Sequence, residues 1–268
     1  MTENNHVLDF WSASPQCGGM QWWMFVLAGA GVGLTFGLFG AGGSAFATPV
    51  LALMGVPPVL AVASPLPAIL PSSIAGAREY FRVGMLDRRV AKLTILAGLP
   101  AVIIGAIVGR QVGGDLLLVL SGVVLLGIGI RMLVPSGARS AEHGEARAHH
   151  TMTVVGMAAG AAFFAGMLAN GGGFLLVPLF VLGLGFTAAR AAGTALVAAM
   201  ALVIPTLLMH WALGDIDWMV AGAFALGMIP ASTIGARYGT KLPDVVTRTL
   251  FGGALLAFSV FFLVTRLG

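Results

Sequence analysis

Charged residues are scarce in this chain of 268 residues: Asp, Glu, Lys and Arg make up 9% of it, whereas hydrophobic residues make up 58%. A soluble domain carries roughly 25% charged residues, so this chain has too few to cover a folded surface in water. Its mean hydropathy is +0.98, and its apolar runs recur at about 20 residues, the length that a helix needs to span hydrocarbon. The composition therefore indicates an integral membrane protein. The formal net charge of +4 comes from short segments between apolar runs and does not indicate nucleic-acid binding.

Cysteine and the features of a signal peptide are also lacking. The single cysteine, Cys17, allows no internal disulfide and does not identify a redox compartment. The first 21 residues contain Glu3 and Asp9 but no Lys or Arg, so they lack the basic start of a secretory signal. We treat residues 1–21 as a periplasmic segment of unassigned role.

The chain contains an internal repeat. After a shift of 129 or 130 residues the following positions agree in order: Gly42 with Gly171, Gly43 with Gly172, Pro49 with Pro178, Ser64 with Thr194, Asp87 with Asp217 and Pro100 with Pro230. Biased composition does not explain Gly, Pro and Asp matching in sequence. We therefore divide the chain into two transmembrane repeats, 22–134 and 151–268, joined by a polar linker, 135–150.

Each repeat is predicted to form four long transmembrane helices and one short helix that follows a glycine-rich break, so the fold class is an all-α membrane protein. The expected helices are 22–40, 45–54, 58–81, 89–109 and 115–134, then 151–169, 174–184, 187–209, 218–238 and 246–265. At ~1.5 Å per residue, each short helix reaches about half of the ~30 Å hydrocarbon core. Asp87 and Asp217 follow loop glycines and are expected to cap the next helix.

Basic residues predict the orientation, because Lys and Arg in short loops favour the cytoplasm. If each repeat crosses five times from a periplasmic N-terminus, twelve of the 14 basic residues are cytoplasmic: Arg78, Arg82, Arg88, Arg89, Lys92, Arg131, Arg139, Arg147, Arg190, Arg237, Lys241 and Arg248. If each repeat instead crosses four times, five of the basic residues lie outside the cytoplasm. An odd number of crossings inverts the second repeat, an architecture common in secondary transporters. Both termini are then periplasmic and the linker cytoplasmic, in a bacterial inner membrane.

The two glycine-rich breaks are the predicted substrate site. They read "LFGAGGSAFATP" (38–49) and "LANGGGFLLVP" (168–178). A new helix N-terminus exposes unpaired N–H groups that attract anions, glycine allows a ligand close to the backbone, and irregular backbone persists in a bilayer only where it is buried in protein or lines a cavity. The candidate ligands are Gly42, Gly43, Ser44, Asn170, Gly171, Gly172 and Gly173. Close helix packing through glycine is the alternative interpretation.

At these motifs the chain resembles the sulfite exporter TauE/SafE family of membrane permeases. The resemblance is carried by "GLFGAGGSAFATPVLALMGVPPVLAVAS" and "GMLANGGGFLLVPLFVLGLGFTAARAAGT", each followed by Gly-x-x-Asp. It implies transport of small anions such as sulfite or organosulfonates like sulfoacetate. The first motif has Ser44 where a third glycine is expected, which adds a hydroxyl to the pocket or narrows it.

Four further side chains are candidate substrate ligands. Hydroxyl groups of Ser64 and Thr194 could donate to an oxyanion, although Ser and Thr also bond their own helix backbone. His210, with an ordinary pKa near 6.5, could bind substrate or a proton, or lie at the outer interface beside Trp211. Arg78 could hold a sulfonate with two hydrogen bonds or anchor the cytoplasmic surface.

The sequence leaves three functional classes open. The first is an alternating-access carrier, and the second is a channel lined by the same pocket. The third is an enzyme, suggested by "GAGVGLTFG" (29–37) or by Ser44 with His210. That stretch lacks the strand and acidic residue of a dinucleotide site, and neither Ser44 nor His210 lies in a nucleophile motif. We expect a small anion and lipid as partners, with no nucleic acid, metal or other cofactor, and a homodimer stays an open alternative to a single copy.

Overall fold

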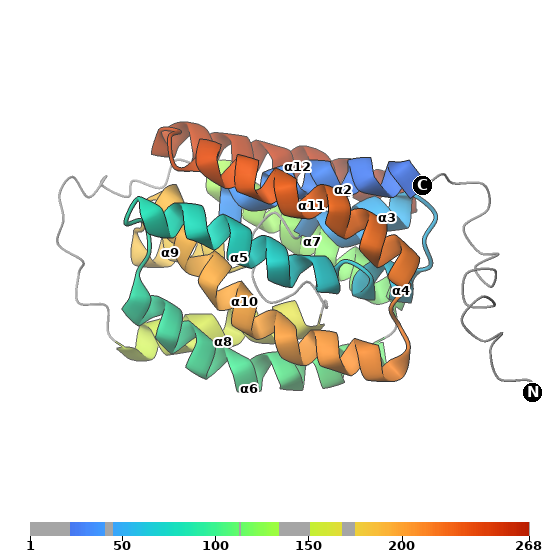
Figure 1. The fold of residues 1–268 in the computed structure, drawn as a ribbon. Helices are drawn as coiled ribbons and strands as arrows, with labels where there is room; N and C mark the ends of the chain where they lie inside the picture. Colours follow the sequence, from blue (N-terminus) through green and yellow to red (C-terminus); the bar gives the residue numbers. More distant parts are fainter. Residues whose placement is uncertain (1–21, 41–44, 113, 134–150, 168–174, 268) are drawn as a thin grey trace, which may run out of the picture.

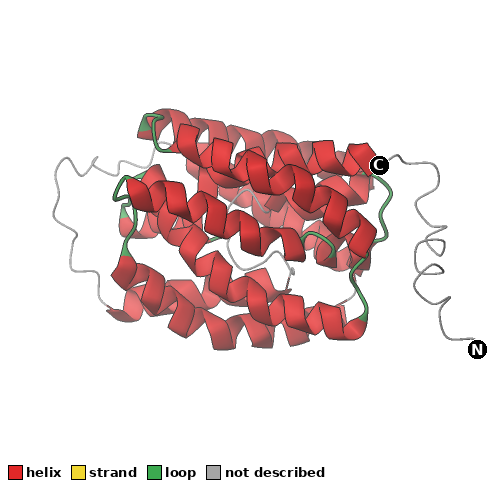
Figure 2. Ribbon diagram, viewed as in Figure 1, coloured by secondary structure: helices red, strands yellow, loops and turns green. Residues whose placement is uncertain are grey.

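The computed structural model describes residues 22–40, 45–112, 114–133, 151–167 and 175–267. These residues form helices and contain no strand (Figures 1 and 2), which confirms the predicted all-α class. The segment predicted as the first repeat contains α2 (Trp22–Phe39), α3 (Ala47–Leu53), α4 (Pro58–Ala63), α5 (Leu66–Arg82), α6 (Arg88–Val112) and α7 (Gly114–Leu133). The second contains α8 (Thr151–Met167), α9 (Leu176–Leu184), α10 (Ala188–Leu213), α11 (Trp218–Gly239) and α12 (Asp244–Leu267).

Six spans in the described chain are long and apolar enough to cross a membrane: α2, the α4–α5 segment, α6, α10, α11 and α12. Two shorter apolar helices, α8 and the Gly122–Leu133 part of α7, accompany them. The helices after the glycine-rich segments are short as predicted, with 7 residues in α3 and 9 in α9. The protein is therefore a multi-pass membrane protein.

The proline-rich helix differs from its prediction, because the structure divides 58–81 into α4 and α5. Pro65 and Pro67 have no N–H, so the carbonyl groups of Ala61 and Ala63 lose their usual helical partners. The chain still turns in a helical sense, since the N–H of Ala68 donates to the carbonyl of Pro65 at 3.0 Å. Hydropathy identifies the whole segment as one span, whereas the two prolines interrupt its hydrogen bonds.

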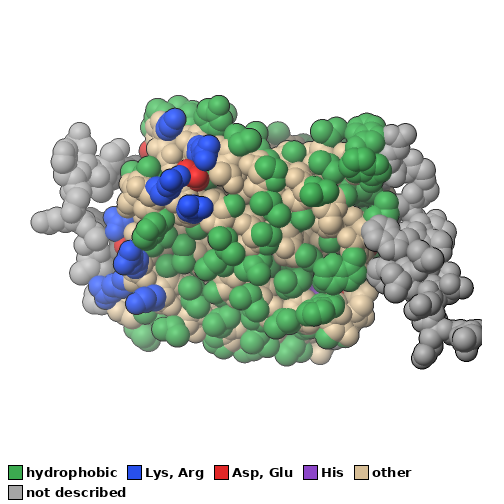
Figure 3. Space-filling view, in the orientation of Figure 1, with side chains coloured by type: hydrophobic (Ala, Val, Ile, Leu, Met, Phe, Trp, Pro, Cys, Tyr) green, Lys and Arg blue, Asp and Glu red, His purple; other side chains and the backbone are tan. Residues whose placement is uncertain are grey.

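The two ends of the bundle differ in charge. Lys and Arg gather at one end (Figure 3), which we call the charged end. The contacts of the ends of α5, α7 and α11 with the starts of α6, α10 and α12 place there Arg82, Arg88, Arg190, Arg237 and Arg248. The other end, which we call the tryptophan end, carries the exposed Trp22, Trp23, Trp211 and Trp218. Tryptophan is enriched at membrane interfaces and basic residues favour one side, so the long axis of the bundle crosses the bilayer.

Glycines allow the closest helix contacts, which join α2 to α11 and α6 to α8. A Cβ atom on Gly37 would lie 2.0 Å from the carbonyl oxygen of Ser232, and one on Gly166 would lie 2.2 Å from that of Val102. The repeat shift moves Gly37 onto Gly166 and Val102 onto Ser232. The same backbone contact therefore occurs twice, with the two repeats exchanged.

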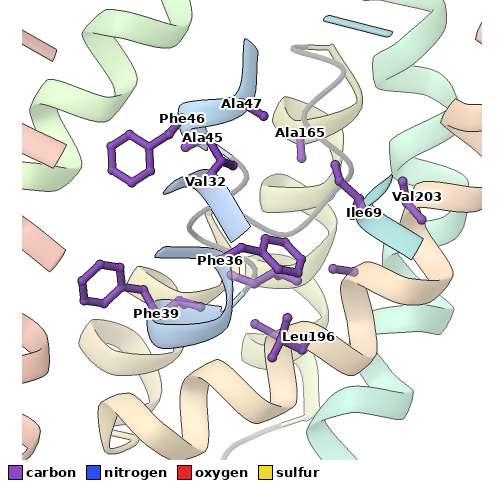
Figure 4. Packing of buried hydrophobic residues seen from close by; sticks show 14 of the residues in the cluster. Val32, Phe36, Phe39, Ala45, Phe46, Ala47, Ile69, Ala165, Leu196 and Val203 are labelled. Atoms are coloured by element: carbon purple, nitrogen blue, oxygen red, sulfur yellow. The ribbon is translucent and has the colours of Figure 1, made fainter. Parts of the chain in front are cut away.

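Side chains from both repeats share one core. Figure 4 shows Phe36 from α2 and Ile69 from α5 in the same buried cluster as Ala165 from α8 and Leu196 and Val203 from α10. Helix α5 packs against α10 with the chains antiparallel, because Gly76 lies next to Leu196 while Tyr80 lies next to Gly193. The midpoints of α5 and α10 consequently meet near the middle of the molecule.

Candidate functional site

Seven predicted site residues lie outside the described residues: Gly42, Gly43, Ser44, Asn170, Gly171, Gly172 and Gly173. Their role stays a prediction. The flanking helices are described, with α2 ending at Phe39 and α8 ending at Met167. Near the end of α2, the buried Tyr80 hydroxyl lies 3.0 Å from the carbonyl oxygens of both Gly37 and Leu38. It satisfies carbonyl groups that are left without helical partners where the helix stops.

Thr194 joins the two repeats at the charged end. Its Oγ1 accepts a hydrogen bond from the backbone N–H of Asp87 at 3.0 Å and donates to the carbonyl of Arg190 at 2.7 Å. At the tryptophan end, the corresponding Ser64 accepts from the backbone N–H of Asp217 at 3.1 Å. Both hydroxyl groups are fully buried. Each one ties its own repeat to the turn that precedes a long helix of the other repeat.

An ion pair reinforces this link at the charged end. Nη2 of Arg190 lies 2.7 Å from Oδ2 of Asp87, and Oδ1 of Asp87 accepts from the N–H groups of Arg89 and Val90 at the start of α6. Burial acts to raise the pKa of the Asp87 carboxyl, but the N–H of Val90, the guanidinium of Arg190 and the N–H of Arg89 outweigh it, so the pKa lies below its usual value. The predicted cap is confirmed.

The tryptophan end has a different arrangement. Asp217 caps α11 by accepting from the N–H groups of Met219 and Val220, as predicted. The position that corresponds to Arg190 is Leu60, an apolar residue. Asp215 instead lies 2.9 Å from Nδ1 of His210, which is buried in the last turn of α10.

The four described candidates do not form one pocket. Thr194 and His210 are sixteen residues apart on α10, which is ~24 Å along a helix. Ser64 lies at the same end as His210, whereas Arg78 is exposed near the charged end of α5. A small anion therefore cannot contact the residues at one end, Ser64 and His210, and those at the other end, Thr194 and Arg78, at the same time. Ser64 and Thr194 instead hold the repeats together at opposite ends.

Ser72 and Ser73 are stronger candidates than the sequence indicated. Both are fully buried, and neither hydroxyl has a hydrogen-bond partner in the part of the chain that the structure describes. They lie at the middle of α5, about halfway between the links at Ser64 and Thr194. Leaving a buried hydroxyl unpaired costs about 1–3 kcal/mol, so each such group needs an explanation, and a role in binding is one. The signal available in the sequence was an adjacent pair of serines after Pro71 inside a membrane span.

Two threonines extend this set of unpaired buried hydroxyl groups. Thr94 on α6 and Thr206 on α10 also lack a partner among the described residues. In the described chain, no group of three or more His, Cys, Asp and Glu side chains could hold a metal ion. The unpaired buried side-chain groups of the described interior are all neutral hydroxyl groups.

Comparison with known proteins agrees with this membrane architecture. A probable membrane transporter protein of Xylella fastidiosa (strain 9a5c) is 28% identical over 251 residues, covering 89% of this chain and 94% of that protein. The probable membrane transporter protein YjnA of Bacillus subtilis (strain 168) is 24% identical over 231 residues, covering 81% of this chain and 89% of its own. No solved structure matches the chain significantly. The family model described as Sulfite exporter TauE/SafE matches residues 25–262, and the chain belongs to that family.

Proposed function

We propose that the protein is a secondary transporter that moves a small anion, such as sulfite or an organosulfonate, across the bacterial inner membrane by alternating access. The observation that carries this proposal is the match of residues 25–262 to a family described as a sulfite exporter. The relatives support the more general statement that the protein is a membrane transporter, because they are named probable membrane transporter proteins and align over most of their length.

An inverted repeat is part of the proposal, and helix directions support it. The contacts of Gly29 with Phe224 and of Gly33 with Met228 make α2 parallel to α11. Contacts of Gly105 with Phe163 and of Gly109 with Met167 likewise make α6 parallel to α8. Since α6 begins beside the start of α10 and α11 begins after its end, the equivalent helices α2 and α8 run in opposite directions. Such repeats place substrate near the middle of the bilayer.

The substrate is proposed to bind between the two glycine-rich segments and the middle of α5. Backbone N–H groups at the starts of the short helices would attract its negative charge. Ser72 and Ser73 would donate hydrogen bonds to its oxygens, replacing water lost on entry. Neutral donors hold an oxyanion less tightly than a guanidinium does, which lets the anion leave on the other side.

Transport would then require the two ends to open in turn. The links available for this are Asp87 with Thr194 and Arg190 at the charged end, and Asp217 with Ser64 at the tryptophan end. Each link joins the two repeats near one surface. Breaking one while the other holds would expose the middle of the molecule to one side only.

Counterflow in proteoliposomes tests this proposal. A carrier exchanges labelled sulfite or sulfoacetate faster when unlabelled anion is on the opposite side, whereas flux through an anion channel follows voltage without exchange. A double substitution, Ser72→Ala with Ser73→Ala, should raise KM about tenfold through two lost hydrogen bonds. It should leave thermal stability unchanged or higher, because it removes unpaired buried groups.

Ser259→Ala is the matched control. Ser259 is also a fully buried serine, but its hydroxyl donates to Leu255 on α12. This variant should transport normally. Unchanged KM in the double variant would place the substrate elsewhere, and absence of anion flux for every sulfur oxyanion and sulfonate would refute the substrate class.

A further inference from the structure

A groove opens on the surface of the bundle between α7, α8 and α9, away from the serines of α5. Its volume is about 670 Å³, and apolar side chains and glycines form its walls. Arg131 is the one charged residue among the described residues that line it. Because the exposed Phe164 lies in its wall and the surrounding helices are apolar, lipid rather than water meets this surface over most of its length.

Three of the four glycines that line the groove do not serve helix contact, whereas the fourth, Gly183, lies against a methionine side chain of α8. At Gly127, Gly156 and Gly160 an added Cβ would meet no atom of the described chain within 4 Å. Glycines of the core behave differently, since a Cβ on Gly37 would lie 2.0 Å from a backbone oxygen of α11. The three groove glycines are therefore not needed for helices of this chain to approach one another. Their effect is to hollow the surface.

The groove extends from the charged end to about the middle of the bilayer. Arg131 is next to Met132, whose carbonyl accepts from Nε of Arg248 at 3.1 Å near the start of α12. From Gly156 to Phe164, α8 advances eight residues, or ~12 Å. Half of a ~30 Å hydrocarbon core is ~15 Å, so the groove matches the depth of one leaflet.

We propose that this groove binds an acyl chain of an anionic phospholipid from the leaflet at the charged end, with the lipid phosphate on Arg131. A guanidinium can hold a phosphate with two parallel hydrogen bonds. Basic pockets between transmembrane helices are known to hold anionic head groups. None of the ion pairs in the described chain uses Arg131, so its charge is available at the mouth of the groove.

A second copy of the chain is the competing occupant. Gly156 and Gly160 have the spacing that brings membrane helices together. The shape of the surface opposes this, because a symmetric pair presents the same patch on both copies. Two hollow surfaces would then face each other across an unfilled space, with two like-charged Arg131 side chains nearby. An acyl chain fills the hollow, and its phosphate neutralises the charge.

Lipid retention by the full-length protein tests the proposal. The protein is reconstituted in equal amounts of phosphatidylglycerol and phosphatidylcholine and then extracted from the bilayer. Native mass spectrometry counts the lipid molecules that stay bound to the extracted protein. Wild type should retain phosphatidylglycerol over phosphatidylcholine by about fivefold, and Arg131→Gln should lose this preference. Gly160→Leu should lose both lipids, because a Cβ at this position meets no described atom within 4 Å and the rest of the side chain would occupy the groove.

Lys92→Gln is the matched control, since Lys92 is an exposed basic residue of α6 at the same end and outside the groove. It should retain lipid as wild type does. Retained preference in Arg131→Gln would overturn the role of the guanidinium, and unchanged lipid in Gly160→Leu would overturn the groove as the site. A disulfide between copies carrying Gly160→Cys and Cys17→Ser in the bilayer would assign the groove to a second copy instead.

Discussion

The links at the two ends of the molecule share a hydrogen bond from a backbone N–H to a hydroxyl, but only one of them includes an ion pair. At both ends a buried hydroxyl accepts a hydrogen bond from the N–H of an aspartate in the other repeat, in the pairs Thr194–Asp87 and Ser64–Asp217. At the charged end Arg190 adds an ion pair to Asp87, whereas the corresponding residue at the tryptophan end is Leu60. The neutral hydrogen bond is therefore common to both repeats, whereas the ion pair of Arg190 occurs only at the charged end.

This difference gives the two ends different opening costs. A neutral hydrogen bond contributes about 0.5–1.5 kcal/mol net. The Arg190 side chain is 39% exposed, so solvent screening limits its ion pair to about 1 kcal/mol or less. In the proposed transport cycle, an excess of that size would be small enough for a substrate to overcome, yet large enough to favour closure of the charged end.

The largest expected effect is on stability, when the aspartate of either link is removed. Asp87→Ala should lower the free energy of unfolding by about 1.5–2 kcal/mol, because it removes a helix cap and the ion pair with Arg190. Asp217→Ala should cost only about 1 kcal/mol, since it removes a cap alone. Thermal unfolding of both variants in the same detergent measures the difference. Equal losses would show that the ion pair adds nothing.

A smaller effect is expected on access to the charged end. Arg190→Leu gives that end the residue type found at position 60, so the two links become alike. A cysteine placed at residue 240, in a Cys17→Ser background, should then react with a thiol reagent about threefold to fivefold faster, as expected for loss of about 1 kcal/mol. A cysteine at residue 213, at the tryptophan end, should not change in this way.

The same two cysteines test orientation. Labelling of 213 from the periplasm and of 240 from the cytoplasm is expected from the proposed topology. Labelling of both from one side would contradict it, whatever the effect of Arg190→Leu.

The smallest expected effect is on acid stability. Since the pKa of Asp87 is lowered in the folded protein, its ionised carboxylate stabilises the fold above the unfolded-state pKa of about 3.9. That contribution is lost as the pH falls from there through the lower folded-state pKa. Unfolding temperatures between about pH 5 and 3 should thus fall less in Asp87→Asn than in wild type. Parallel curves for the two proteins would contradict this contribution.

Much of the fold could be predicted from the sequence. The apolar runs predicted the long spans, and the glycine-rich segments predicted the short helices α3 and α9. The break between α4 and α5 was missed, although Pro65 and Pro67 carried the signal, because hydropathy is continuous across it. A proline removes a hydrogen bond without changing the apolar character of a span.

Less of the candidate site could be predicted. The repeat shift paired Ser64 with Thr194 and Asp87 with Asp217. All four residues form hydrogen bonds between the repeats, but each hydroxyl bonds to the aspartate of the other repeat. Residue types alone made Ser64, Thr194, His210 and Arg78 candidate ligands of one substrate. Their positions at opposite ends of long helices rule out a common contact.

The amino-acid sequence by itself determined that this protein is helical, membrane-embedded and repetitive, because hydropathy and local spacing are properties of each segment alone. Only the tertiary structure decided which aspartate meets which hydroxyl, which buried serines lack a partner among the described residues and where the surface is hollow. These features depend on how helices distant in sequence pack against each other, and that packing depends on backbone contacts such as those of Gly37 and Gly166, whose partners lie in the other repeat.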